Sequence, residues 1–274
     1  MKNKVLLIND LPGYGKVALS AMFPVLSAMG YDIYNLPTAL VSNTLDYGRF
    51  EILDTTEYMQ KTLEVWQALD FSFDCICTGF IVSEAQVKLV GDYVREQKAK
   101  GVFAVVDPIM GDDGHLYNGI TEATVENMRK LCEVADIITP NFTEAAFLAD
   151  MYQEKAVVSH DEARRLVEKL NGEGKRSVIM TSVACDDGKH YVYGYSHVSD
   201  EYFEIPFQMI PVRFPGTGDL FSAFMVGDVI RGAALKEAVQ KAMRRVSALI
   251  EKNQGNEDKY KGIPIEQYLT GGEM

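Results

Sequence analysis

The chain has 274 residues, of which 47% are hydrophobic and 24% charged, so it can bury a full-sized core and is not expected to be disordered. Its formal net charge of −12 argues against a nucleic-acid or anionic membrane surface, because both demand clustered Lys and Arg. No stretch approaches a membrane span, and the apolar run near the N-terminus is too short for a signal peptide.

Short Val/Ile-rich runs alternate with longer amphipathic runs. The predicted strands are 5–8, 33–37, 75–78, 102–106, 137–139 and 177–181, and the predicted helices are 17–29, 57–69, 84–98, 121–132 and 160–170. Capping-box residues mark two of the helix starts, Ser83 with Gln86 and Ser159 with Glu162. Antiparallel strands at 189–196 and 201–205 follow, and helices at 220–231 and 235–252 complete the series. This alternation predicts an α/β fold with a central, mostly parallel sheet and helices on both faces, as one domain over residues 1–274.

Four cysteines are present, none in a CxxC pair: Cys75, Cys77, Cys132 and Cys185. They are expected to be buried free thiols of a reducing compartment, which predicts a cytoplasmic protein.

Ligands of such sheets bind at the carboxyl ends of the strands, so the loops there decide the function. The first loop carries Gly13-x-Gly15-x-x-Ala18, which invites a dinucleotide interpretation. The second strand lacks the terminal acid that would hold a ribose, and Lys16 is followed by Val rather than Ser or Thr. Both a nicotinamide site and a P-loop are therefore disfavoured.

The fourth strand is followed by Asp107, Asp112 and Asp113 in a Gly-rich loop. Acids in this setting suit a hydrated divalent cation, since Mg²⁺ takes one or two carboxylates and keeps several waters. A solvated acidic turn is the alternative for Asp112 and Asp113.

Polar residues also follow the next two strands. Thr139, Asn141 and Glu144 come after the fifth strand, where Asn141 and Glu144 could either serve a ligand or simply cap the next helix. Thr181 and Ser182 end the sixth strand with two hydroxyls suited to phosphate oxygens.

Near the C-terminus, Gly216-Thr217-Gly218-Asp219 precedes an almost wholly apolar run. The run predicts a buried helix, which places Asp219 in a first turn beside free N–H groups. Asp219 is either a helix N-terminal acid or a base beside a backbone anion site. Acids for a metal, hydroxyls for phosphates and a backbone nest with a carboxylate together suit phosphoryl transfer.

The order and spacing of the motifs resemble the ribokinase superfamily, and within it the pyridoxal kinases, over nearly the whole chain. The landmarks are Tyr14-Gly15, Phe23-Pro24, Val41-Ser42-Asn43, Tyr47-Gly48, Asp107 to Asp112, Asp136 to Asn141 with Glu144, and Gly216 to Asp219. The resemblance implies a ribokinase-like fold, a homodimer, and ATP-dependent phosphorylation of the 5′-hydroxymethyl group of a vitamin B6 vitamer.

The resemblance also implies residue roles. Asp219 would be the catalytic base, and the amides of Gly216, Thr217 and Gly218 the anion hole. ATP would be bound by Asp107, Asn141, Glu144, Thr181 and Ser182. Mg²⁺ would be organised by Asp112, Thr139 and Glu144, with a monovalent cation such as K⁺ near Asp107. Residues 115–118 would belong to a mobile loop over the substrate.

The implied vitamer site comprises Asp10, Val41, Thr44 and Phe80, and here the chain departs from the family. Asp10 stands where relatives usually have Ser, Thr44-Leu45 replaces His-Thr, and Phe80 replaces Tyr. An acid at position 10 predicts a preference for the cationic vitamer pyridoxamine. The departures leave a hydroxymethylpyrimidine or sugar kinase of the same fold as one alternative. A non-catalytic vitamer-binding module is a second alternative, from a different class of protein. They also leave Lys16, where relatives often have His, either at the substrate or in solvent.

Overall fold

The structure is a computed structural model that describes residues 3–117, 120–152 and 157–269. The chain divides into two compact units, one formed by Met1–Val82 with Ile210–Met274 and the other by Ser83–Met209. Among the described residues, no helix is long and apolar enough to cross a membrane.

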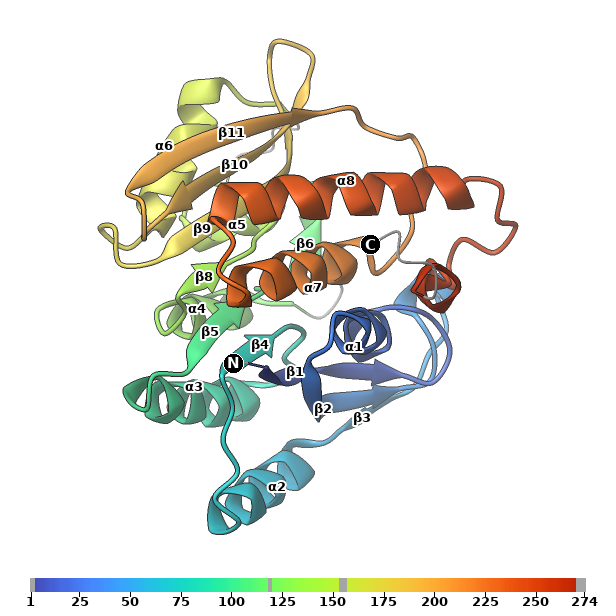
Figure 1. The fold of residues 1–274 in the computed structure, drawn as a ribbon. Coiled ribbons are helices and arrows are strands. Elements are labelled where there is room, and N and C mark those ends of the chain that lie inside the picture. The colour runs from blue at the N-terminus through green and yellow to red at the C-terminus, as the bar shows by residue number, and fades with distance from the viewer. Residues whose placement is uncertain (1–2, 118–119, 153–156, 270–274) are drawn as a thin grey trace. The chain divides into compact units, whose positions relative to one another are not determined.

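The first unit contains a four-stranded stretch of sheet in the order β4 (Cys75–Thr78), β1 (Lys4–Pro12), β2 (Asp32–Val41), β3 (Ile52–Asp54). β1 pairs in parallel with β2 and β4, and β3 is antiparallel to β2. Helices α1 (Ala18–Ala28) and α2 (Thr56–Ala68) lie on opposite faces of this sheet (Figure 1). The expected parallel sheet with helices on both faces is therefore present in this unit.

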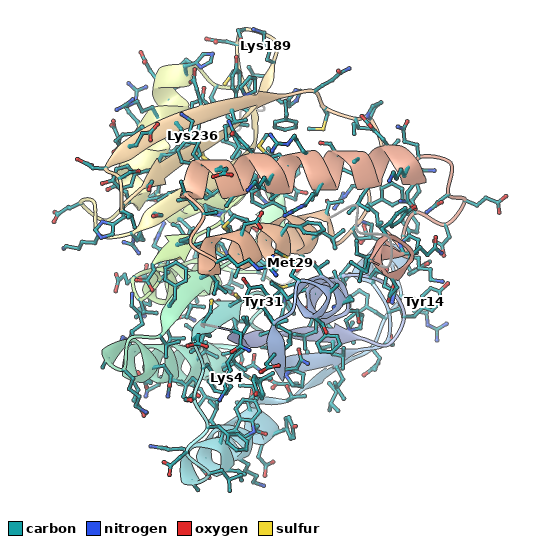
Figure 2. The ribbon with its side chains drawn as sticks, viewed as in Figure 1. Lys4, Tyr14, Met29, Tyr31, Lys189 and Lys236 are labelled. Carbon is teal, nitrogen blue, oxygen red and sulfur yellow. The ribbon has the colours of Figure 1, made fainter. Side chains whose placement is uncertain are left out.

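Two long helices complete the first unit, α7 (Thr217–Ile230) and α8 (Leu235–Asn253), with short 3₁₀ turns η1 (Leu45–Tyr47) and η2 (Ile265–Tyr268). α7 packs between α1 and α8, which explains why its residues from Leu220 to Asp228 are all buried. Met29 and Tyr31 lie against α7 (Figure 2), and the Tyr31 hydroxyl donates a hydrogen bond to the carbonyl of Gly227. These contacts hold the C-terminal end of α7 against the segment that follows α1.

The second unit contains strands in the order β11 (Glu201–Phe207), β10 (His190–Ser196), β9 (Ser177–Ala184), β8 (Ile137–Ile138), β5 (Phe103–Val106). The last three pair in parallel, whereas β10 is antiparallel to both of its neighbours, as predicted. The turn between β9 and β10 carries Lys189 (Figure 2). The helices are α3 (Glu84–Ala99), α4 (Glu122–Cys132), α5 (Phe142–Leu148) and α6 (His160–Leu170), and a small hairpin joins β6 (Gly111–Asp112) to β7 (His115–Leu116).

The predicted elements differ from the structure mainly at their ends. The strand at 75–78 and the helix at 160–170 have the predicted bounds, whereas α7 begins three residues before the predicted 220, because Gly216 caps it. The capping box at Ser159 is complete, but at Ser83 the structure shows only the half in which the Ser83 hydroxyl accepts from the Gln86 amide. β3, β6 and β7 were not predicted, since strands of two or three residues show no periodicity.

Candidate active site

Asp219 lies in the first turn of α7, as the sequence predicts, and its carboxylate is held from two sides. Oδ2 accepts a hydrogen bond of 2.8 Å from the backbone N–H of Ala18, and Oδ1 accepts one of 3.4 Å from Nδ2 of Asn9. Burial raises the pKa of Asp219 to about 6, while these two hydrogen bonds act in the opposite direction. A half-buried carboxylate with this pKa is ionised at neutral pH and basic enough to accept a proton.

The glycines before Asp219 have different surroundings. Gly216 is the N-cap of α7 with a φ of 83°, and a Cβ there would lie 2.1 Å from the carbonyl oxygen of Lys16. Gly218 is exposed, and a Cβ there would have no heavy atom within 4 Å. The first N–H groups of a helix lack partners within it, so this open end of α7 can receive an anion.

The Asn9 side chain connects the backbone of Asp10 and the backbone of Phe80 to the Asp219 carboxylate. The Asn9 Oδ1 accepts hydrogen bonds from the backbone N–H of Asp10, at 3.0 Å, and of Phe80, at 2.8 Å. Burial, and then the charge of Asp219, raise the pKa of Asp10 to about 7. The first unit therefore brings the carboxyl groups of Asp10 and Asp219 and the backbone of Phe80 together around Asn9, a residue that the sequence-based predictions did not include.

The other two predicted vitamer residues have structural contacts. Thr44 is buried, and its hydroxyl donates to the carbonyl of Tyr260 at 2.7 Å. Val41 is buried in β2, where its carbonyl accepts from the N–H of Gly13 at 2.7 Å. The Gly13 contact holds the first loop against β2, and the Thr44 contact holds the segment after β2 against the C-terminal segment. Lys16 belongs to the same arrangement, because its ammonium group pairs with Glu266.

In the second unit, Asn141 and Glu144 form a complete capping box at the start of α5. The Asn141 Oδ1 accepts from the Glu144 amide at 2.9 Å, and the Glu144 Oε2 accepts from the Asn141 amide at 2.8 Å. Each residue also holds the preceding loop, through the amide of Met110 on Glu144 Oε1 and the carbonyl of Gly111 on Asn141 Nδ2. The helix-capping contacts that were one alternative for Asn141 and Glu144 are therefore present. The same two side chains also hold the acidic loop against α5.

The metal candidates surround this loop. Burial, and then the negative charge of Asp107, raise the pKa of Glu144 well above its ordinary value. The buried hydroxyl of Thr139 has no hydrogen-bond partner among the described residues, and Asp112 is half-buried in β6. A buried acid next to a second acid, with an unsatisfied hydroxyl at the neighbouring strand end, fits a hard cation that prefers oxygen ligands. Among the described residues, no group of three or more His, Cys, Asp or Glu side chains could hold a metal ion by itself.

Thr181 and Ser182 lie at a β-bulge in β9. Tyr191 pairs with Val183 and Tyr193 with Met180, so two residues of β9 face one residue of β10. Ser182 is exposed and has a φ of 60°, a conformation that non-glycine residues rarely adopt. A bulge re-aims side chains, and here it separates these two hydroxyls from the regular ladder.

The predicted covering loop, residues 115–118, is described in part. His115 lies in β7, and the N–H of Gly114 just before it donates to the Thr143 hydroxyl at 2.8 Å. Asn118 lies outside the described residues.

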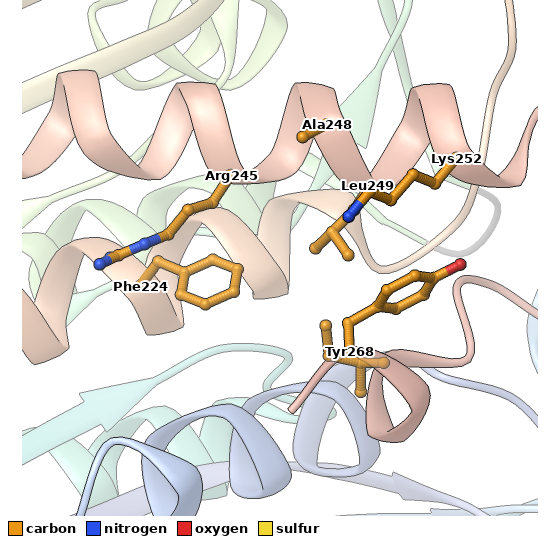
Figure 3. Close-up of a pocket in the computed structure, with 7 residues that line it drawn as sticks. Phe224, Arg245, Ala248, Leu249, Lys252 and Tyr268 are labelled. Carbon is orange, nitrogen blue, oxygen red and sulfur yellow. The ribbon is translucent and has the colours of Figure 1, made fainter. Parts of the chain in front are cut away.

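A small cavity of about 60 Å³ lies in the first unit between α7, α8 and η2 (Figure 3). Its lining is Phe224, Arg245, Ala248, Leu249, Lys252, Ile265 and Tyr268. The Arg245 guanidinium pairs with Asp228 at 2.8 Å and lies 5.2 Å from the centre of the Phe224 ring. Ligand pockets typically measure about 300–1,000 Å³, so this space is too small to hold a nucleotide or a vitamer.

The chain is similar to known kinases over nearly its whole length. A family model described as phosphomethylpyrimidine kinase matches residues 24–263. A candidate pyridoxal kinase of Schizosaccharomyces pombe is 31% identical, over 97% of this chain and 89% of that protein. A structure of a candidate phosphomethylpyrimidine kinase from Bacteroides thetaiotaomicron, in a crystal form with pyridoxal, has a TM-score of 0.92 and 34% identity, covering 98% of this chain and 95% of that one.

A third similar protein is the pyridoxal kinase of Leishmania donovani in complex with ADP and pyridoxamine. Its structure has a TM-score of 0.85 and 25% identity, covering 97% of this chain and 94% of that one. These similarities confirm the resemblance inferred from the motifs. The chain therefore belongs to the phosphomethylpyrimidine kinase family, in the group of ribokinase-like proteins that contains the pyridoxal kinases.

Proposed function

We propose that this protein is an ATP-dependent kinase that phosphorylates the 5′-hydroxymethyl group of a B6 vitamer. The observation that carries the proposal is the Asp219 carboxylate, held at the open N-terminus of α7 by Ala18 and Asn9. The similar proteins support it, since their names include pyridoxal kinase and their structures include complexes with pyridoxal, with ADP and with pyridoxamine.

The first unit supplies the acceptor chemistry. The acceptor oxygen forms a bond to the γ-phosphorus as the bond from that phosphorus to the β–γ bridging oxygen breaks, and ADP leaves. The hydroxyl proton passes to the carboxylate of Asp219. Negative charge on the transferring group is stabilised by the N–H groups at the start of α7, which remain fixed during the reaction.

The second unit supplies groups for the nucleotide. Thr181, Ser182 and Asn141 are assigned to the phosphates, and Asp107 to the surroundings of a monovalent cation. Asp112, Thr139 and Glu144 would hold Mg²⁺, largely through waters, because the buried hydroxyl of Thr139 lacks a partner among the described residues. The bound Mg²⁺ would neutralise charge on the phosphates.

A substrate panel with an ADP-release assay tests the proposal. We expect turnover with pyridoxal, pyridoxine or pyridoxamine that exceeds turnover with hydroxymethylpyrimidine and with sugars. Turnover of hydroxymethylpyrimidine alone would identify the rival kinase of the same fold. Tight vitamer binding without any ADP release would identify a non-catalytic binding module, and either result would overturn the proposal.

Replacing Thr139 by Val tests the metal assignment. Valine has nearly the same shape and removes a buried hydroxyl that lacks a partner, so folding stability should stay equal or rise by about 1 kcal/mol. The Mg²⁺ concentration that gives half-maximal activity should rise about 10-fold, the lower end of the effects seen around metal sites.

The matched control is Thr78→Val, because Thr78 is the other described residue whose buried hydroxyl has no partner. That variant should show the same gain in stability, measured by thermal unfolding, with an unchanged Mg²⁺ requirement. Equal Mg²⁺ curves for both variants would remove Thr139 from the metal site.

The charge of Asp10 should make vitamer preference depend on pH. With its pKa raised to about 7, Asp10 is neutral below that pH and negative above it. The ratio of kcat/KM for pyridoxamine over pyridoxal should therefore rise about 10-fold as pH increases through about 7, since hydrogen bonds to charged groups contribute about 1.5–3 kcal/mol. Titration of Asp219 affects both vitamers and cancels in the ratio.

The control for this prediction is Asp10→Ser, which places a non-titrating hydroxyl where relatives usually have Ser. The ratio should then be independent of pH. A wild-type ratio that stays flat, or a slope that survives in Asp10→Ser, would show that Asp10 does not select the vitamer.

The proposed assembly is a homodimer formed through the β1–β3 face. Leu11, Leu40 and Leu53 are register partners across three strands, lie on one face of the sheet, and are all exposed. Such a row of leucines suits an interface with a second copy. Light scattering should give the mass of a dimer for the wild type and of a monomer for Leu53→Glu. An unchanged dimer in that variant would place the interface elsewhere.

A cytoplasmic location fits the four buried free thiols.

A further inference from the structure

Asn9 is a polar residue in the core of the first unit, and its side chain is almost fully satisfied. Asn9 follows the apolar residues of β1 along the strand, and only 1% of the residue is exposed. Its Oδ1 accepts two backbone hydrogen bonds, from Asp10 at 3.0 Å and Phe80 at 2.8 Å. Its Nδ2 faces Asp219 Oδ1 at 3.4 Å and Met22 Sδ at 3.8 Å. The amide is therefore anchored through its oxygen and presents its N–H group to Asp219.

The position of this amide is enforced by close packing. A Cβ on Gly79 would lie 2.3 Å from Nδ2 and 2.6 Å from Oδ1 of Asn9. A side chain at position 79 would therefore force the Asn9 amide out of its present position. Glycine here gives room to Asn9 rather than freedom to the backbone, because Gly79 is not among the glycines with positive φ.

Few charged groups on the surrounding elements could interact with the Asp219 carboxylate in place of the Asn9 amide. β1 contributes Asp10, whose carboxyl group interacts repulsively with Asp219. α1 contributes the backbone N–H of Ala18 and has no acid in its first turn. Lys16, in the loop before α1, pairs with Glu266 of η2, and Arg245 of α8 pairs with Asp228 of α7. The two donors recorded on the Asp219 carboxylate are thus one backbone amide and the Asn9 side chain.

We propose that Asn9 is a positioning residue that locks the Asp219 carboxylate, the Asp10 backbone and the Phe80 backbone into one rigid assembly. In this assembly Asn9 keeps Asp219 ionised and aimed at the acceptor hydroxyl. Asn9 also couples the base to the residue on which a vitamer ring can stack. The proposal rests on the proposed kinase function, in which Asp219 is the base.

The variant Asn9→Asp isolates the contact to Asp219. Aspartate has the same shape and keeps an oxygen for the amides of Asp10 and Phe80, but it replaces the N–H donor by a second carboxyl oxygen. The pKa of Asp219 should then rise by about one pH unit or more, because a like charge disfavours ionisation. Met22→Leu is the matched control, since it removes the other neighbour of Nδ2 and should leave that pKa unchanged.

The pKa of Asp219 is measured by ¹³C NMR titration of its side-chain carbon, with Asp219→Asn to assign the signal. This readout needs no activity, so it separates a failure of the Asn9 proposal from a failure of the proposed function. Where the wild type is active, the acidic limb of kcat/KM should shift by the same amount. A residue with a purely structural role would lower the melting temperature without moving either value.

Gly79→Ala provides a second route to the same disturbance, through displacement of the Asn9 amide. It should raise the pKa of Asp219 in the same direction and decides the question if Asn9→Asp does not fold. An unchanged Asp219 pKa in whichever of the two variants folds overturns the proposal. Misfolding of both, with Met22→Leu folding normally, also overturns it, because Asn9 would then act on the fold as a whole.

Discussion

Asp219→Asn should abolish most of the kinase activity while leaving the fold intact. Asparagine has the shape of aspartate and can accept the hydrogen bond from Ala18, but it cannot take a proton from the acceptor hydroxyl. General-base catalysis typically contributes about 10²–10⁴-fold, so kcat should fall by about that factor with little change in KM for ATP. The measurement is steady-state ADP release with the preferred vitamer.

Calorimetric ATP binding and the circular dichroism spectrum of Asp219→Asn should match those of the wild type. These two controls distinguish the loss of the catalytic base from unfolding of the protein. Turnover within about threefold of the wild type, far below the effect of a general base, would reject the role assigned to Asp219. A loss of ATP binding would instead mean that Asp219 organises the nucleotide site.

Replacing each of the two glycines before Asp219 by alanine should change the folding stability in opposite directions. Gly216→Ala forces a Cβ to within 2.1 Å of the Lys16 carbonyl at a φ of 83°, so unfolding free energy should fall by about 2–4 kcal/mol. Gly218→Ala places its methyl group in open space and improves helix propensity, so stability should rise by about 0.5–1 kcal/mol.

Kinase activity should fall in Gly218→Ala even though its stability rises. The methyl group of Gly218→Ala occupies the space through which a phosphoryl group reaches the first amides of α7, so kcat should fall about 10-fold or more, as when one oxyanion-hole donor is lost. Denaturant unfolding and ADP release on both variants give the comparison. A fully active Gly218→Ala would mean that the transferring group does not approach this turn.

Periodicity and capping predicted most of the fold. The apolar run after Gly216 predicted α7. The importance of the loops after successive strands, which rests on parallel strands ending at one edge of a sheet, stays a prediction. Ser159 with Glu162 fixed the start of α6 to the residue. The short strands β3 and β6 left no such signal, since two or three residues cannot establish alternation.

The sequence alone could not assign the polar contacts inside the site. Asn141 and Glu144 were compatible with both capping and ligand binding, and the structure shows the capping contacts in full. Asn9 gave a weak signal as a polar residue ending an apolar strand, yet its partners Phe80 and Asp219 are 71 and 210 positions away. The sequence placed Thr139 at a strand end but could not show that its hydroxyl lacks a partner, because an unsatisfied hydroxyl is a property of packing.

The proposed kinase function is tested most directly by the ³¹P NMR spectrum of a reaction containing ATP, Mg²⁺ and pyridoxamine labelled with ¹³C at the 5′-carbon. This function predicts a phosphomonoester signal coupled to the labelled carbon, growing as the γ-phosphate of ATP disappears, and almost absent with Asp219→Asn. Consumption of ATP that yields only inorganic phosphate, or a coupled signal that forms equally fast in Asp219→Asn, would contradict it.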